Sequence, residues 1–344
     1  MNTLFVVDPL GGLAADIDAS VGLMAACRAE GAEVWVCEPG DLSVAGGRLV
    51  ARATRISLRP RHRGGDHRWR IESPWFDVAA HEELDVAARC GLVWLRIDPP
   101  VDARYLHTTY LLDLASAAGV RVVNHPAGVR ALHEKLLTLQ LPDLCPATTV
   151  TSRAGEVEAF VATYGAAVVK PLDGFAGTDV WLLEPGRSCR SLAESATAGR
   201  RHVIVQEYLP AVDAGNKRLF VVDGEIAGAV ERRPSDADFR IGPPVAAAAV
   251  DADDRRIVAA LAPRLMTHGI ALAGLDVIDG RLIEVNVTCP GGMHKADALL
   301  GTDLSGDIVR RLLTPPNREE PPCQPSPSSA SPSWASCCSP WAPT

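Results

Sequence analysis

The first 126 residues alternate short apolar runs with longer segments in which apolar positions recur every three or four residues. The longer segments at 18–30 and 102–118 predict amphipathic helices, the first with Asp18 or Ser20 as N-cap and Gly31 as its stop. The apolar runs predict strands at 3–9, 32–38, 92–100 and 120–126. This order predicts a doubly wound α/β domain with functional groups at the carboxyl ends of its strands. No GxGxxG motif follows the first strand, so a dinucleotide cofactor is not expected.

The middle of the chain changes to strands that pair with their neighbours. Asp-Gly dipeptides between alternating apolar residues predict two hairpins. The predicted elements are a strand and glycine-containing turn at 165–177, a strand at 201–210, a hairpin at 217–234, a helix at 252–268 and a hairpin at 274–288.

The last hairpin carries two carboxylates and an amide among its apolar residues: Asp276, Glu284 and Asn286. The default interpretation is a solvated strand face, since antiparallel strands often present one side to water. Glu284 and Asn286 are two residues apart and therefore share a face, while Ile283 and the next odd-numbered residues are expected in the core.

The turn of this hairpin decides whether Asp276 joins that face. A two-residue turn at Asp279 and Gly280 places Asp276 and Glu284 on opposite faces. A three-residue turn over 278–280 with Gly280 left-handed makes them diagonal neighbours, about 7–8 Å apart at the backbone. We predict the three-residue, bulged turn, because two converging carboxylates suit Mg²⁺, which prefers oxygen ligands.

The bulk composition excludes several classes of protein. The 344 residues are 47% hydrophobic with a net charge of −8, which predicts a globular protein without a nucleic-acid partner. No apolar run reaches the roughly 18 residues that a membrane span needs. The N-terminus lacks the basic region of a signal peptide, so we expect a cytoplasmic protein.

Three other features remain without a functional assignment. The nine cysteines lack CxxC spacing, so reduced thiols are expected and zinc is not. The run at 51–70 holds seven arginines and is interpreted as a solvated hairpin or surface loop. The Pro- and Ser-rich segment at 314–344 is expected to be disordered.

Cationic side chains precede the last hairpin at the ends of ordered segments. They are Lys135, Lys170, Lys217, Arg218 and Arg232. Each alone is a weak signal, because a single lysine at a strand end usually lies at the surface. The ordered set of cations with a carboxylate–amide group predicts a nucleoside triphosphate site without a Walker loop.

The chain resembles the prokaryotic glutathione synthetase family of the ATP-grasp superfamily over most of residues 1–313. KPLDG followed by the D…E-x-N hairpin is the most specific part of this resemblance. The motifs that carry it are VVDP (6–9), R-x-DPP (96–100), TTYLLD (108–113), VVNHP (122–126), HEKL (133–136), VVKPLDG (168–174), QEYLPA (206–211), KRLFVVDGE (217–225) and GLDVIDGRLIEVNVT (274–288).

The resemblance implies a Rossmann-like N-terminal domain over 1–125 and an ATP-grasp domain of two α+β subdomains over 126–313, with a lid at about 146–205. It also implies an ADP-forming carboxylate–amine ligase that forms an acyl phosphate. The implied reaction joins γ-glutamylcysteine and glycine to make glutathione. A homo-oligomer is expected on the same ground.

The resemblance implies a role for each matched residue. Arg232, Lys170 and Arg218 are expected to be catalytic, and Asp276, Glu284 and Asn286 to bind Mg²⁺ or Mn²⁺. The expected ATP-binding residues are Lys135, Lys170, Asp173, Gln206, Glu207, Tyr208, Leu209 and Lys217. The expected substrate-binding residues are Arg96, Asp98, Tyr110, Arg240 and Cys289.

Several positions depart from the family pattern. A glycine-rich GGETRxN loop is replaced by residues 234–250, PSDADFRIGPPVAAAAV, which contain two adjacent prolines. His133 stands for Asn, Ala176 for Gly, Cys289 for Ser and Gly291 for Thr. Three interpretations follow: a glutathione synthetase, a ligase of the same mechanism with other amino-acid-like substrates, or a nucleotide-binding paralogue without catalysis.

Overall fold

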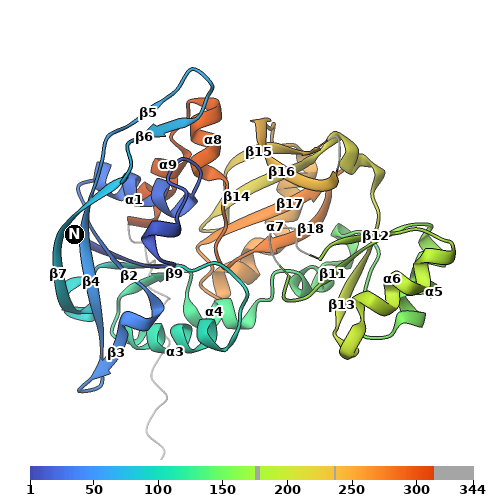
Figure 1. Cartoon of the computed structure of the whole chain (residues 1–344), viewed down its shortest axis with the longest axis horizontal. Coiled ribbons are helices and arrows are strands. Elements are labelled where there is room, and N and C mark those ends of the chain that lie inside the picture. The colour runs from blue at the N-terminus through green and yellow to red at the C-terminus, as the bar shows by residue number, and fades with distance from the viewer. Residues whose placement is uncertain (175–178, 236–237, 314–344) are drawn as a thin grey trace, which may run out of the picture. The chain divides into compact units, whose positions relative to one another are not determined.

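The computed structural model describes residues 1–174, 179–235 and 238–313. The predicted disorder at 314–344 and the change at Ala176 lie outside these residues. Within them, three larger sheets and a two-stranded hairpin are built from successive parts of the chain, as the colours of Figure 1 show.

The first sheet has seven strands from the N-terminal part of the chain. Their order is β3-β4-β2-β1-β8-β9, with β7 paired to β4. β1 runs parallel to β2 and β8, and β8 runs parallel to β9. The strands are β1 (Asn2–Val7), β2 (Glu33–Cys37), β3 (Leu42–Ala45), β4 (Arg48–Leu58), β7 (Phe76–Asp85), β8 (Leu92–Arg96) and β9 (Arg121–Val123).

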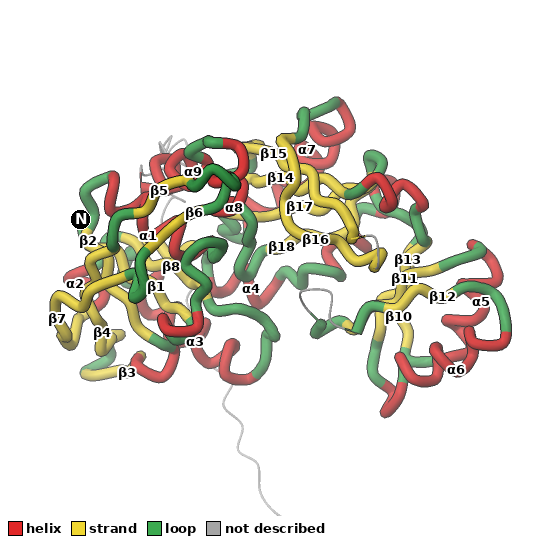
Figure 2. Tube along the Cα trace, turned by 45° about the horizontal axis from the view of Figure 1, so that its top comes forward, coloured by secondary structure: helices red, strands yellow, loops and turns green. Residues whose placement is uncertain are grey.

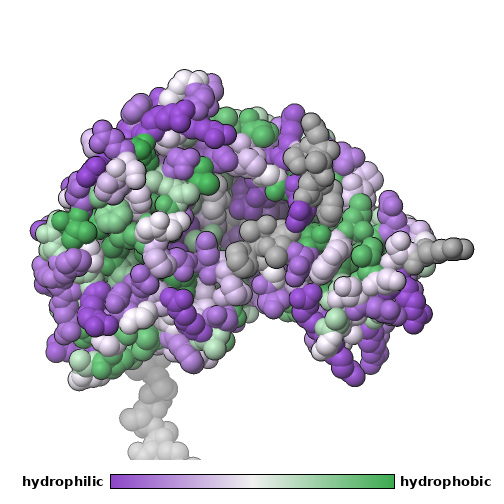
Figure 3. Space-filling model, in the orientation of Figure 1, coloured by the Kyte–Doolittle hydropathy of each residue, from purple (hydrophilic) through white to green (hydrophobic). Residues whose placement is uncertain are grey.

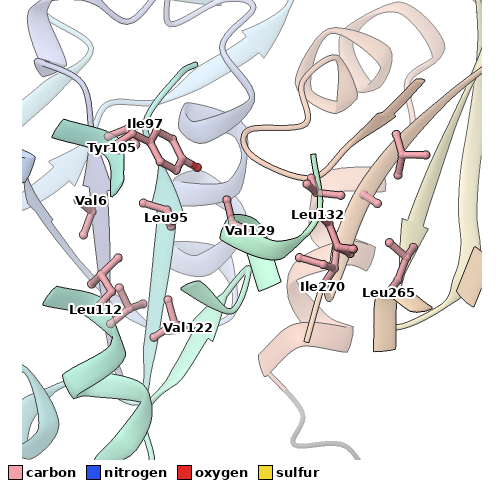
Figure 4. Close-up of a cluster of buried hydrophobic side chains, with 14 of the residues drawn as sticks. Val6, Leu95, Ile97, Tyr105, Leu112, Val122, Val129, Leu132, Leu265 and Ile270 are labelled. Carbon is pink, nitrogen blue, oxygen red and sulfur yellow. The ribbon is translucent and has the colours of Figure 1, made fainter. Parts of the chain in front are cut away.

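Helices cover both faces of this sheet. α1 (Ala19–Ala29) packs on one face with Trp94, whereas α3 (Ala103–Ala117) packs on the other with Leu95. Neighbouring strand residues point to opposite faces, which is why these two residues belong to different cores. Figure 4 shows Leu95 and Leu112 of α3 within one cluster. The prediction of a doubly wound α/β domain is confirmed.

The first helix begins and ends where the sequence predicts. The Asp18 side chain accepts a hydrogen bond from the Ser20 amide at 2.7 Å and is the N-cap of α1. Gly31 follows the helix with a φ of +77°, a left-handed conformation that suits glycine.

The interpretation of residues 51–70 as a surface hairpin is wrong for the first part of the run. Residues up to Leu58 belong to β4, an inner strand in which Ala51 and Ala53 are buried. The second part does form a hairpin, of β5 (Arg61–Arg63) and β6 (Trp69–Ile71). Arg52 alternates with the buried Ala51 and Ala53, and Arg55 lies over the Trp35 ring and pairs with Glu33, so charge alone did not mark a loop.

The second sheet is antiparallel and has the order β10-β13-β11-β12. Figure 2 shows α5 and α6 together on one side of these strands, and their apolar residues form a separate core with the strands. The elements are β10 (Thr148–Thr151), β11 (Ala167–Pro171), β12 (Trp181–Leu183), β13 (Val203–Glu207), α5 (Ala154–Tyr164) and α6 (Arg187–Ala196).

The third sheet is antiparallel with the order β16-β15-β14-β17-β18. Its strands are β14 (Asn216–Val222), β15 (Glu225–Ser235), β16 (Asp238–Ala247), β17 (Leu272–Ile278) and β18 (Arg281–Asn286). One face packs on α7 (Ala252–Thr267) and the other on α8 (Met293–Leu300) and α9 (Leu304–Leu313).

Short helices complete the connections. They are α2 (Val86–Arg89), α4 (Pro126–Ala131), and the 3-10 helices η1 (Leu10–Gly12), η2 (Pro39–Asp41), η3 (Leu136–Gln140), η4 (Pro142–Leu144), η5 (Ala198–Arg200) and η6 (Pro210–Ala214).

Candidate active site

A cleft of about 590 Å³ brings residues of the N-terminal part, the second sheet and the third sheet together. Figure 3 shows hydrophilic side chains inside the hollow that opens on this face. The predicted site residues that line the cleft are Asp98, Lys135, Lys170, Gln206, Glu207, Tyr208, Leu209, Arg218, Arg232, Arg240, Asp276, Glu284, Asn286 and Cys289. Residues that are far apart in sequence therefore converge as predicted.

The β17–β18 hairpin closes differently from the prediction. Ile278 pairs with Arg281, so the turn has two residues, Asp279 and Gly280, both with positive φ. A bulge in the ladder next to the turn then pairs Asp276 directly with Glu284. The three-residue turn was wrong, but the shared face that it was meant to explain is present.

The bulge also changes the place of Ile283. This residue was expected in the core, but it lines the cleft, whereas the following odd-numbered residues Val285 and Val287 are fully buried. An extra residue between the paired positions shifts the alternation locally, and that shift is what frees Ile283 from the core.

Two guanidinium groups hold the Asp276 carboxylate. Arg218 donates from Nε to Oδ1 at 2.5 Å and from Nη2 to Oδ2 at 2.8 Å, and Arg232 Nη2 lies 2.7 Å from Oδ1. Burial favours the neutral acid, yet Arg218 and then Arg232 outweigh burial and lower the pKa of Asp276 to about 2. The carboxylate is therefore ionised at neutral pH.

Glu284 has a cation of its own. Lys135 Nζ lies 3.4 Å from Glu284 Oε1 and donates to the Gly174 carbonyl at 2.5 Å. Only 6% of Lys135 is exposed. Like charges placed directly opposite on adjacent strands repel each other. Separate cations beside Asp276 and Glu284 offset that repulsion and allow both carboxylates to face one cleft.

Lys170 lies at the end of β11 and points to the same cleft. Its Nζ donates to Gln206 Oε1 at 2.9 Å, and among the described residues no carboxylate lies within 4.0 Å of it. Burial lowers the pKa of Lys170, because the charged form is poorly solvated there. Gln206 is its only hydrogen-bond partner in the described part of the chain, and a buried cation with a neutral partner is suited to bind an anion.

The segment that links β13 to η6 forms one wall of the cleft. The Glu207 amide donates to the Ala147 carbonyl at 2.9 Å and the Tyr208 amide to the Ala166 carbonyl at 3.1 Å. Within the described part of the chain, the amide of Leu209 donates to no acceptor. This wall therefore has one backbone donor available for a ligand.

The cleft is also lined by Asp98, Cys289 and Arg240. The Cys289 thiol donates to the Arg96 carbonyl at 3.6 Å, and burial raises its pKa well above the ordinary value. A thiol with a raised pKa is a weak nucleophile at neutral pH, which agrees with a wall residue rather than a covalent catalyst.

The predicted set omits Glu134 and Asn216, which also line the cleft. Glu134 Oε1 accepts three hydrogen bonds, from the Val287 amide at 2.9 Å, the Thr288 amide at 3.0 Å and the Thr288 hydroxyl at 2.7 Å. Burial, and then the Glu284 carboxylate, raise the pKa of Glu134. Its place beside Lys135 in the HEKL motif was the signal that could have found it.

The prediction that Lys217 binds the nucleotide is not supported by its place in the structure. Lys217 faces α7, where Nζ lies 2.7 Å from Asp251 Oδ2 and 2.6 Å from Asp254 Oδ2. It does not belong to the cleft lining, although its neighbour Arg218 does. Adjacent residues on a strand point to opposite faces, so only one of the two can reach the cleft.

Three further predicted residues also lie outside the cleft lining. Tyr110 is 57% exposed on α3 and packs its ring under the Arg130 guanidinium at 4.4 Å. Asp173 is exposed. Arg96 is buried behind the wall, where Nη2 donates to the Pro290 carbonyl at 3.1 Å, so its contact with the cleft is indirect. The structure therefore gives no support to substrate contacts by Tyr110.

The segment expected to be a loop at 234–250 is also different. Much of it forms β16, which pairs with β15 across several register shifts, and Arg232 lies opposite Pro244. Arg240 and Ile241 of this strand line the cleft. The change from glycine-rich loop to paired strand thus lies at the wall of the site itself.

Solved structures with the same arrangement of elements define the class of fold. D-cycloserine synthetase DcsG has a TM-score of 0.58 at 21% identity and covers 90% of this chain and 99% of its own. A RimK domain ATP-grasp protein from Sphaerobacter thermophilus has a TM-score of 0.56 at 19% identity, covering 91% of this chain and 100% of its own. The fold is the ATP-grasp fold, as predicted.

Sequence comparison narrows the class to one family. The model of the prokaryotic glutathione synthetase N-terminal domain matches residues 1–130, and that of the prokaryotic glutathione synthetase ATP-grasp domain matches residues 134–301. The chain belongs to the prokaryotic glutathione synthetase family, which confirms the resemblance.

Curated relatives agree with this assignment. The glutathione synthetase of Thermosynechococcus vestitus is 40% identical over 320 residues, which cover 91% of this chain and 100% of the relative. That of Synechococcus elongatus is 41% identical over 321 residues, covering 91% and 98%. In the described part of the chain, no helix is both long and apolar enough to cross a membrane.

Proposed function

We propose that this protein is an ATP-dependent, ADP-forming carboxylate–amine ligase that makes glutathione from γ-glutamylcysteine and glycine. The observation that carries the proposal is the convergence of Lys135, Lys170, Arg218 and Arg232 around two ionisable carboxylates in one cleft. Such a set of fixed cations is what a reaction that transfers a phosphoryl group requires. The names of the curated relatives support the same reaction.

The nucleotide would lie along the wall at residues 206–209. The free Leu209 amide supplies a donor for an adenine ring nitrogen. Lys135 and Lys170 are placed to bind the phosphates, because both line the cleft and Lys170 has no carboxylate partner among the described residues. Arg232 and Arg218 would stabilise charge on the transferred phosphoryl group.

The donor set fits a magnesium ion that accompanies ATP. Asp276 Oδ2 accepts one hydrogen bond and keeps a lone pair, and Asn286 donates from Nδ2 to the Gly274 carbonyl at 3.0 Å, which leaves its Oδ1 as an acceptor. With Glu284 these groups form a set of hard oxygen donors, which a magnesium ion would use to neutralise phosphate charge. Among the described residues, no group of three or more His, Cys, Asp or Glu side chains offers a metal site, and the proposed set therefore combines two carboxylates with one amide.

The two chemical steps use these groups in turn. A substrate carboxylate oxygen attacks the γ-phosphorus, and the bond from phosphorus to the ADP oxygen breaks. The amine nitrogen of the second substrate then attacks the acyl carbon, loses a proton, and phosphate leaves. The cations keep the same positions through both steps, which limits the reorganisation that each step needs.

A second candidate is a ligase of the same mechanism with other amino-acid-like substrates. The observation that favours it is β16, which stands where the family pattern has a glycine-rich loop and places Arg240 and Ile241 in the wall. The expectations of a homo-oligomer and of a cytoplasmic location remain predictions, as do the domain boundaries at 125 and 313.

The test is ADP release by the purified protein with Mg-ATP, γ-glutamylcysteine and glycine, each omitted in turn. Release that requires both acceptors supports glutathione synthesis. Tight binding of Mg-ATP without release on these substrates would move the assignment to the second candidate, whose substrates are then found by screening other carboxylates and amines.

A further inference from the structure

The arginine-rich β5–β6 hairpin contacts both ends of α8. Arg63 donates from Nη2 to the Leu299 carbonyl at 2.7 Å and from Nε to the Ala298 carbonyl. These carbonyls belong to the last turn of α8, where a helix has no partners of its own for them. A cation at a helix C-terminus also interacts favourably with the helix dipole.

The other end of α8 is held by Trp69 and Arg61. The Trp69 indole donates from Nε1 to the His294 carbonyl at 2.8 Å and stacks on the His294 ring at 5.4 Å between centroids. The Arg61 guanidinium lies over the Trp69 ring at 4.5 Å, and its Nη1 lies 3.2 Å from His294 Nδ1. Burial, and then Arg61, lower the pKa of His294 to about 4, so its ring is a neutral partner at neutral pH.

The N-terminus of α8 leads directly into the wall of the cleft. Gly292 is the N-cap of α8 with a φ of +103°, and Cys289 and Gly291, which precede it, line the cleft. Arg96 Nη2 donates to the Pro290 carbonyl at 3.1 Å, and Arg218 Nη1 to the Gly291 carbonyl at 3.3 Å. Residues 289–292 are therefore held on one side by Arg218 of the cleft and by Arg96 behind it, and are continuous with α8 on the other.

We propose that the β5–β6 hairpin is a positioning element for the acceptor wall of the active site, with Arg63 and Trp69 as its positioning residues. These side chains touch neither the cleft nor the reacting groups. They fix α8, and α8 fixes residues 289–292, of which Cys289 and Gly291 line the cleft. The kinetic part of this proposal rests on the proposed ligase function, whereas the structural part does not.

The proposal predicts a selective effect on the acceptor substrates. The nucleotide wall at 206–209 and the lysines at 135 and 170 belong to other elements, and among the described residues none of their hydrogen bonds is to the hairpin. Loosening α8 should therefore raise the KM for γ-glutamylcysteine or glycine, while the KM for ATP stays nearly constant. A purely structural hairpin would change the thermal stability without separating the two KM values.

The decisive variant is Arg63→Ala, and the matched control is Arg70→Ala. Arg70 lies in the same hairpin, but its partner is Asp66 at 2.6 Å and it makes no bond to α8. Amide hydrogen exchange over residues 289–300 is measured first, without any substrate. We expect exchange about five- to tenfold faster in Arg63→Ala and unchanged in Arg70→Ala, with a similar rise in the acceptor KM.

Two further variants keep the test sharp. Arg63→Lys retains one donor and should restore exchange and KM part of the way to wild type. Trp69→Phe keeps the ring that stacks on His294 and removes only the Nε1 donor, so it serves if Arg63→Ala does not fold.

Equal exchange in Arg63→Ala and Arg70→Ala would overturn the positioning role, as would equal changes in the KM for ATP and for the acceptors. If the wild type releases no ADP with these acceptors, the proposed function fails. The exchange measurement still decides the positioning role in that case.

Discussion

Lys170→Met is the substitution that most directly separates binding from stability in this cleft. Among the described residues, the Lys170 ammonium has one hydrogen-bond partner, the neutral Gln206 side chain at 2.9 Å, and burial lowers its pKa. Methionine has nearly the same length and no charge. The nucleotide-free protein should therefore gain stability, whereas the complex with Mg-ATP should lose a phosphate contact.

The magnitudes follow from the two environments of the ammonium group. A hydrogen bond to a charged group contributes about 1.5–3 kcal/mol, and each 1.4 kcal/mol is tenfold in affinity, so Mg-ATP should bind about 10- to 100-fold more weakly. Removing a poorly compensated charge from the nucleotide-free cleft should raise the free energy of unfolding by about 1 kcal/mol.

The pH dependence of stability tests independently whether the charge on Lys170 destabilises the nucleotide-free protein. The folded chain releases the Lys170 proton at a lower pH than the unfolded chain, whose lysine pKa is 10.5. Between these two pKa values the unfolded chain binds more protons, so the stability of the nucleotide-free wild type should rise with pH there. Lys170→Met should lack this rise.

Lys217→Met is the matched control, because Lys217 has the opposite surroundings. Burial opposes its charge, but hydrogen bonds to Asp251 and Asp254 outweigh burial and raise its pKa. Removing this lysine leaves the Asp254 carboxylate buried without its cation, which should cost about 3 kcal/mol of stability. The affinity for Mg-ATP should stay at the wild-type value.

Titration calorimetry with Mg-ATP and thermal unfolding without nucleotide measure both quantities for both variants. Wild-type affinity in Lys170→Met would remove Lys170 from the phosphate site. A Lys170→Met protein less stable than wild type would show that the fold stabilises this ammonium in the absence of nucleotide, contrary to the reasoning from its partners.

Three more substitutions test other parts of the site. Glu284→Gln keeps the shape of the side chain but removes the charge beside Lys135. ADP release should fall about 100-fold or more, with an unchanged circular dichroism spectrum. Unchanged release would show that Glu284 does not belong to the site. The pKa of Asp276 is lowered from 3.8 to about 2, so its ionised form contributes about 2 kcal/mol to the free energy of unfolding. This contribution is present above pH 3.8 and is lost as the pH falls through 2. Urea unfolding at several acidic pH values should show the loss in wild type but not in Asp276→Asn. The Tyr105 hydroxyl is buried without a hydrogen-bond partner among the described residues. Tyr105→Phe should therefore raise the free energy of unfolding by about 1 kcal/mol, as measured by thermal melts. A loss of stability would show that the hydroxyl has a partner after all.

The sequence predicted those elements whose signals are local. The period of the apolar residues identified α1 and α3, and the cap at Asp18 and the glycine at 31 marked the ends of α1. The Asp-Gly dipeptides located the β14–β15 and β17–β18 hairpins of the third sheet. These features depend on neighbouring residues only, so tertiary contacts had little to overrule.

The turn of the β17–β18 hairpin shows where local signals are insufficient. Asp279 and Gly280 favour a two-residue turn, and that turn forms. We predicted a three-residue turn instead, because a two-residue turn followed by a regular ladder would place Asp276 and Glu284 on opposite faces of the sheet. The ladder is not regular, and no glycine or proline marks the bulge near Ile283. The shared face of Asp276 and Glu284 was predicted correctly, while the bulge that produces it was not visible in the sequence pattern.

The pair Lys217 and Arg218 shows how a period-two argument corrects a resemblance. The resemblance assigned Lys217 to the nucleotide and Arg218 to catalysis, yet neighbours on one strand point to opposite faces and cannot both reach one cleft. Arg218 pairs across the ladder with Asp276, which in turn pairs with Glu284, so these three side chains form a row over three adjacent strands.

Asn216 lies two residues before Arg218 and opposite Arg232, so Asn216 and Arg232 lie on the same face as Arg218. Lys217 alternates to the other face and meets the capping carboxylates of α7. Side chains alternate between the two faces of each strand, so the register with Asp276 and Glu284 places Arg218 and Asn216 on the face of the cleft and Lys217 on the other face. This assignment needs only the strand register.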